Sequence, residues 1–76
     1  MHLEILTPDK KLFTGEVSSV TVPGSSGSFT VLNDHAPIVS TLEKGDVLVN
    51  SGASTFPIKS GVIEVLKNQV IILAEE

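Results

Sequence analysis

The sequence predicts an all-β protein, a flattened β-sandwich or barrel of about eight to ten short, mostly antiparallel strands. Apolar and polar residues alternate with the period of two that is typical of strands, and a helical period is nearly absent. Val, Ile and Thr, which favour strands, dominate these stretches. Turn-forming residues recur every few positions. The first expected strand ends before Pro8. The other expected strands cover residues 11–22, 28–32, 38–42, 47–50, 54–58, 62–66 and 69–74.

The first two strands differ in how clearly they alternate. Leu3 and Ile5 share one face, and the strand that contains them ends at the turn formed by Pro8 and Asp9. Val17 and Val20 have opposite parity within the stretch 11–22. Either a bulge at the two serines between them shifts the register, or this strand is apolar on both faces.

Four connections have clear turn chemistry. Residues 23–27 form a loop rich in Gly and Ser, and residues 43–46 form a tight turn. Residues 51–53 join two strands as a hairpin, and Lys67-Asn68 fits a two-residue hairpin turn. Pro57 lacks a backbone N–H, so its strand should lie at the edge of a sheet.

The last strand breaks the pattern of a two-layer sandwich, because residues 70–74 are apolar on both faces. Two interpretations follow. The strand is central and covered within the fold, or its outer face is covered by another chain.

Composition limits the classes of function. The 76 residues make one small domain of marginal stability, with no Cys for disulfides or thiolate metal sites. A protein partner is therefore the expected source of additional stability. The net charge is -4 and the five lysines are scattered, which argues against nucleic-acid binding. The longest apolar run is far shorter than the ~20 residues of a membrane span, and no secretory signal precedes it, so we expect a soluble, intracellular chain.

The densest cluster of reactive groups is Asn33 to Pro37. Asp34 and His35 are adjacent, so their side chains diverge in extended backbone and do not suit a catalytic pair. A metal site would need a third ligand from elsewhere, and the sequence offers no spacing that supports one. No serine lies in a nucleophile elbow. His35 either braces the turn or contacts a protein partner. The glycine-rich loop 24–27 is followed by a strand instead of a helix, so it lacks the geometry of a phosphate cradle.

The order of these motifs resembles the N-terminal domain of the epsilon subunit of F-type ATP synthases, called delta in mitochondria. The similarity covers essentially the whole chain. Its motifs are His2-Leu3, Phe13-Thr14-Gly15, Gly24 to Gly27, His35-Ala36-Pro37, Lys44-Gly45 and Ser60-Gly61-Val62-Ile63-Glu64-Val65, with Val62 where relatives commonly have a second glycine.

The resemblance implies a flattened sandwich, usually described as ten-stranded, that acts as a non-catalytic rotor subunit. Such a subunit binds the gamma subunit and contacts the membrane c-ring, so that ion-driven rotation is coupled to ATP synthesis. It implies no cofactor, and a peripheral position on the cytoplasmic side of the bacterial inner membrane. Carried over by position, the gamma-binding residues are Thr7, His35, Pro37 and Ser40, and the c-ring-binding residues are Ser26, Gly27 and Ser28.

Relatives commonly continue into a C-terminal helical hairpin, which in some lineages inhibits ATP hydrolysis and binds ATP. We expect residues 1–76 to be a single sandwich domain without this hairpin, and hence without ATP binding. Two alternatives from other classes are a stand-alone β-sandwich module that binds a peptide or small ligand at an exposed edge, and a small hydrolase that uses His35.

Overall fold

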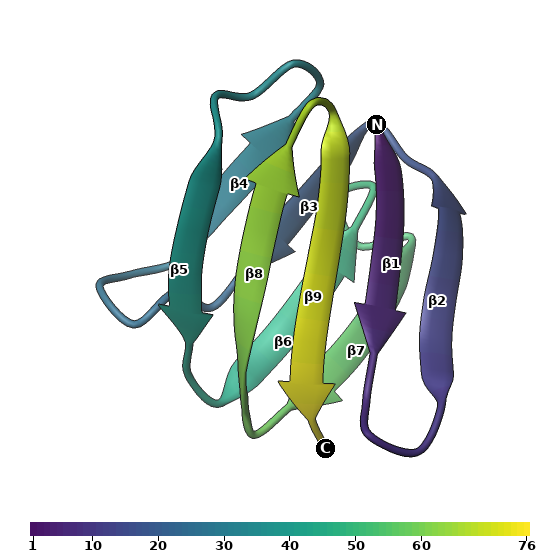
Figure 1. Ribbon diagram of the computed structural model, residues 1–76. Helices are drawn as coiled ribbons and strands as arrows, with labels where there is room; N and C mark the ends of the chain where they lie inside the picture. The colour runs from purple at the N-terminus through teal and green to yellow at the C-terminus, as the bar shows by residue number, and fades with distance from the viewer.

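The computed structural model describes residues 1–76 as nine strands in two facing sheets (Figure 1). The prediction of an all-β sandwich is confirmed. No helix is present that could cross a bilayer. The five-stranded sheet has the order β2-β1-β9-β8-β5, and the four-stranded sheet has the order β4-β3-β6-β7. The strands are β1 (His2–Leu6), β2 (Lys11–Glu16), β3 (Ser19–Val22), β4 (Phe29–Leu32), β5 (Ile38–Leu42), β6 (Gly45–Val49), β7 (Ser54–Ile58), β8 (Ser60–Leu66) and β9 (Gln69–Glu75).

The strand pairing is antiparallel except in the centre of the five-stranded sheet. There β9 lies between β8, which is antiparallel to it, and β1, which is parallel to it. The parallel register pairs His2 with Gln69 and Leu6 with Leu73. The first and last strands of the chain are therefore neighbours.

The prediction of one strand over residues 11–22 is wrong. The chain leaves β2 after Glu16, passes through Val17 and Ser18, and enters the opposite sheet as β3. Val17 and Val20 are both buried. Their opposite parity therefore reflects a change of sheet, because the core lies on a different side of each one.

The core fills the space between the sheets with aliphatic side chains. Leu3, Ile5, Ile63 and Ile72 of the five-stranded sheet are fully buried. Burying a side chain of this size contributes about 1.5–3 kcal/mol. The other core residues are Met1, Val17, Val20, Val22, Val31, Leu42, Val47, Val49, Ile58, Val65, Val70 and Ala74.

The turn predictions fit the backbone closely. Lys67 and Asn68 have φ values of 51° and 59°, as a type I′ hairpin turn requires. The strand of Pro57 lies at the edge of the four-stranded sheet, as predicted. The turn expected over 43–46 is shorter, because Gly45 already pairs with Ile58.

Candidate partner-binding surface

The outer faces of the two sheets differ in chemistry. The face of the four-stranded sheet carries Thr21, Thr30 and Thr55 together with two leucines, Leu48, which is half-buried, and Leu32, which is exposed on the edge strand. The face of the five-stranded sheet also carries polar residues, among them His2, Glu4, Thr14 and Glu64, but it has more large apolar side chains. We call its six large apolar residues the apolar outer face: Leu6, Val39, Val62, Leu66, Ile71 and Leu73.

Cross-strand register makes the apolar outer face continuous. Leu73 is paired with Leu6 on one side and with Val62 on the other, so three apolar side chains form one row. Leu73 is 51% exposed and Val39 on the edge strand is 77% exposed. Exposed apolar residues that are contiguous in this way are typical of a protein interface.

This arrangement bears on the two interpretations of the last strand. β9 is the central strand of its sheet, and Val70, Ile72 and Ala74 are buried against the core. Of its outer residues, Ile71 is half-buried among its neighbours and Leu73 is 51% exposed. Central position alone therefore does not account for the apolar character of both faces.

Shallow hollows mark the same face. Each of the hollows on the protein surface is lined by at least one residue of the apolar outer face. One lies at the lower end of the sheet and is lined by Leu6, Thr7, Pro8 and Leu73, among others. Another lies at the upper end, between Leu66 and the β4–β5 loop.

The predicted gamma-binding residues occupy different places around this face. Thr7 lines the lower hollow, whereas His35 and Pro37 line the upper one, at the opposite end of the sheet (Figure 1). Ser40 shares the parity of Ile38 and Leu42, which face the core, so its side chain points away from the apolar outer face. Assignment of these residues to gamma stays a prediction.

Thr7 also has a structural role. Its hydroxyl donates to the carbonyl of Lys10 at 3.2 Å and accepts from the backbone N–H groups of Asp9 and Lys10. These bonds hold the turn between β1 and β2.

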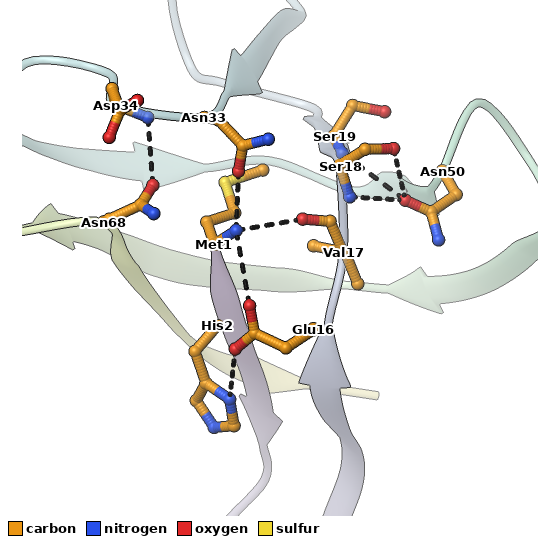
Figure 2. Close-up of polar contacts among 10 residues, drawn as sticks. All are labelled: Met1, His2, Glu16, Val17, Ser18, Ser19, Asn33, Asp34, Asn50 and Asn68. Atoms are coloured by element: carbon orange, nitrogen blue, oxygen red, sulfur yellow. Dashed lines mark hydrogen bonds and ion pairs between the residues drawn. The ribbon is translucent and has the colours of Figure 1, made fainter.

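The loop 33–37 is anchored at two points (Figure 2). The Met1 ammonium donates to Asn33 Oδ1 at 2.6 Å, and the Asp34 N–H donates to Asn68 Oδ1 at 2.9 Å. Asp34 has a φ of 62°, which a short polar side chain tolerates. The His35 ring bonds through Nδ1 to the carbonyl of Ala36 at 2.7 Å. The loop is therefore a fixed corner that presents His35 and Pro37 beside Leu66.

A second polar cluster secures the passage between the sheets (Figure 2). Asn50 Oδ1 accepts from the Ser18 N–H, the Ser18 hydroxyl and the Ser19 N–H, at 2.8, 3.0 and 3.4 Å. Glu16, at the end of β2, approaches the Met1 ammonium at 3.6 Å and the His2 ring at 3.3 Å. Sequence reasoning missed both clusters, because their partners are far apart along the chain.

The surroundings of His35 do not fit a hydrolase that uses this residue. The His35 ring bonds to a backbone carbonyl, and no serine hydroxyl or carboxylate contacts it. No group of three or more His, Cys, Asp or Glu side chains is placed to hold a metal ion.

The predicted c-ring residues, 26–28, lie at the exposed tip of the loop between β3 and β4. The base of this loop is fixed to β5, because Ser25 bonds to Thr41 through both backbone and side chain, at 3.0 and 2.8 Å. Gly24 is required by close packing, since a Cβ there would lie 2.6 Å from the Gly27 carbonyl. Contact of the tip with a c-ring stays a prediction.

Comparison with known proteins agrees with this architecture. The family model described as "ATP synthase, Delta/Epsilon chain, beta-sandwich domain" matches residues 1–76. The ATP synthase epsilon chain of Caulobacter vibrioides is 43% identical over 77 aligned residues, which span 99% of this chain and 90% of the relative. That of Chlorobaculum tepidum is 44% identical, spanning 97% and 88%.

Solved structures agree on the fold. A chain in the central stalk and c-ring part of the Tetrahymena thermophila mitochondrial ATP synthase superposes with a TM-score of 0.86 at 17% identity, spanning 99% of this chain and 63% of that one. At this identity the likeness shows the shared sandwich alone. The full-length family match and the identity to the two bacterial relatives carry the assignment: the chain belongs to the epsilon-chain family of ATP synthases, whose members are subunits of the complex and not enzymes on their own.

Proposed function

We propose that this chain is a rotor subunit that binds the gamma subunit through the apolar outer face and rests on the c-ring through the loop tip 26–28. In this role it couples ion-driven rotation of the c-ring to the shaft that drives ATP synthesis. Membership of the epsilon-chain family and the resemblance of the motifs to that family support the role.

The observation that carries the proposal is the apolar outer face. Its most exposed members, Val39 and Leu73, are large and aliphatic, and covering them with a protein surface removes apolar area from water at about 25 cal/mol per Å². A small domain without disulfides gains stability from such a partner. Thr7, His35 and Pro37 lie at the rim of the same face and extend the proposed contact.

The proposed c-ring contact uses the other exposed feature. The loop tip 26–28 is small and polar, and it stands on a base that is hydrogen-bonded to β5. A polar tip on a fixed base suits contact with the polar loops of a membrane ring. We place the chain peripherally on the membrane-bound complex, at the cytoplasmic side of the bacterial inner membrane.

Two of the four sheet edges are poorly suited to the edge-binding alternative. The free edge of β7 contains Pro57, which cannot donate to an added strand. The lower end of the β5 edge is occupied by the bonds from Ser25 to Thr41.

The test is binding to purified gamma subunit of the same organism. We expect the chain to form a stable complex with it on size-exclusion chromatography, and to co-purify with gamma and the c-ring from solubilised membranes. A chain that stays monomeric in the presence of gamma would refute the proposal.

A matched pair of variants locates the binding face. Leu73→Ser changes a residue that is 51% exposed on the apolar outer face, and Leu32→Ser changes one that is 59% exposed on the other sheet. We expect Leu73→Ser to weaken gamma binding on the order of tenfold and Leu32→Ser to leave it unchanged. Equal effects of the two changes would place the contact elsewhere.

A further inference from the structure

The carboxylate of Glu64 stands in the middle of the apolar outer face, and Glu4 lies in the same cross-strand row on the other side of Ile71. Glu64 lies on β8, where Val62 and Leu66 are its neighbours two positions away on the same side of the strand. Across the sheet it is paired with Ile71 of β9 and with Val39 of β5. All four side chains around Glu64 on this face are therefore apolar.

Glu64 has no partner within the chain. Its carboxylate forms no hydrogen bond with another residue and no ion pair within 4.0 Å. The other acidic residues of this sheet are engaged: Glu4 pairs with Lys11 at 3.5 Å, Glu16 with the Met1 ammonium, and Glu75 accepts a hydrogen bond from Ser60. Only solvent compensates the charge of Glu64, because its side chain is exposed.

The surface on either side of Glu64 is hollowed. One hollow is lined by Glu64, Leu66 and Ile71 together with Lys67 and Gln69. The other is lined by Pro37, Val39, Glu64 and Leu66, among others. A surface that packs against this region with side chains in both hollows necessarily covers the carboxylate between them.

Covering the carboxylate with apolar atoms alone would oppose binding. A carboxylate that loses its water without gaining a counter-charge or hydrogen-bond donors destabilises the complex. The apolar outer face therefore accepts only a partner that places a donor above Glu64. An arginine meets this requirement best, because its planar fork of N–H groups bonds to both carboxylate oxygens and its aliphatic stem packs on the surrounding apolar residues.

We propose that Glu64 forms an ion pair with an arginine or lysine of the gamma subunit, and that this pair selects gamma and fixes its register on the apolar outer face. The proposal rests on the proposed function. It adds the chemistry of the partner surface: an apolar patch with one basic side chain at its centre.

The experiment measures the dissociation constant of the full chain for purified gamma by calorimetry at low and high salt. Glu64→Gln keeps the shape of the side chain and removes its charge. We expect it to weaken binding at low salt on the order of tenfold and to flatten the salt dependence. Glu64→Lys should weaken binding on the order of 100-fold or more, because it places like charges together.

The matched control is Asp46→Asn. Asp46 is an exposed carboxylate on the outer face of the four-stranded sheet, with no ion pair of its own. We expect its change to leave both the affinity and the salt dependence unaltered. A charge-swap then identifies the partner residue: Glu64→Lys combined with a gamma variant in which one Arg or Lys becomes Glu should recover most of the lost affinity.

The outcomes separate the two proposals. If the unmodified chain binds gamma but Glu64→Gln binds equally well at every salt concentration, the ion pair is refuted and the proposed function stands. In that case Glu64 serves only to keep an apolar face soluble, and Glu64→Gln should increase self-association. If the unmodified chain does not bind gamma, the proposed function fails and the ion pair fails with it.

Discussion

Asn50 offers a direct test of how the passage between the sheets is held. Its side-chain oxygen accepts three hydrogen bonds from Ser18 and Ser19, and its backbone has a φ of 52°. Asn50→Ala removes the acceptor and puts alanine into the left-handed backbone conformation, which asparagine tolerates better because its polar side chain can form local hydrogen bonds. Asn50→Gly also removes the acceptor, but glycine adopts a positive φ without steric strain. Asn50→Asp keeps an acceptor oxygen.

The magnitude follows from these contacts. The two shorter bonds, at 2.8 and 3.0 Å, contribute about 1 kcal/mol each at most, and the bond at 3.4 Å contributes less. Alanine in the left-handed region costs roughly 1 kcal/mol more than asparagine or glycine. We expect Asn50→Ala to lower the free energy of unfolding by about 2–3 kcal/mol and Asn50→Gly by about 1–2 kcal/mol. Asn50→Asp should stay within about 0.5 kcal/mol of the original chain.

Urea unfolding followed by circular dichroism measures these differences, and a thermal scan should show Asn50→Ala melting about 10–20 °C lower. The order of stability is the decisive result, since it separates hydrogen bonding from backbone strain. If glycine at this position were less stable than alanine, the strain argument would be wrong. If Asn50→Ala lowered the free energy of unfolding by less than about 0.5 kcal/mol, the three hydrogen bonds would make no net contribution to stability.

Three further predictions concern the core, a close backbone approach and the corner loop. Ile63 is fully buried, so Ile63→Ala should lower the free energy of unfolding in urea by about 2–5 kcal/mol and Ile63→Val by about 0.5–1.5 kcal/mol. Equal urea midpoints for the variants and the original chain would contradict the tight packing around Ile63. Gly61→Ala would place a Cβ 2.6 Å from the Leu73 carbonyl, so it should cost about 1–3 kcal/mol through displacement of β8 from β9, and an unchanged melting temperature would exclude that contact. His35→Ala should raise the dissociation constant for gamma on the order of tenfold while lowering the free energy of unfolding by about 1 kcal/mol, the value of its bond to Ala36. A collapse of the melting temperature with unchanged affinity per folded molecule would make His35 a turn brace instead.

Local sequence patterns predicted what depends on local geometry. Alternation located most strands, and the two-residue turn at Lys67-Asn68 followed from its composition. Pro57 was placed at a sheet edge because it lacks a donor. These signals need no knowledge of distant residues.

The errors and omissions arose where distant segments meet. Alternation reports which residues face the core but not which sheet they belong to, so the change of sheet at Val17 and Ser18 was not visible. The bond of the Met1 ammonium to Asn33 joins positions that no local pattern connects. For the proposed interface, the apolar character of residues 70–74 left open whether the last strand is covered within the fold or by another chain, whereas only strand order revealed Glu64 among the apolar outer residues.

The parallel pairing of β1 with β9 sets the order in which the domain can fold. Because β9 lies between β1 and β8, the five-stranded sheet without it is two separate ribbons, β2-β1 and β8-β5. During synthesis the first strand must therefore wait, with one edge unpaired, until the last strand has left the ribosome. Contacts between such distant parts of a chain slow folding and leave apolar surface open to aggregation in the meantime. A nascent chain that stops before Gln69 consequently lacks the strand that joins the two ribbons into the native sheet.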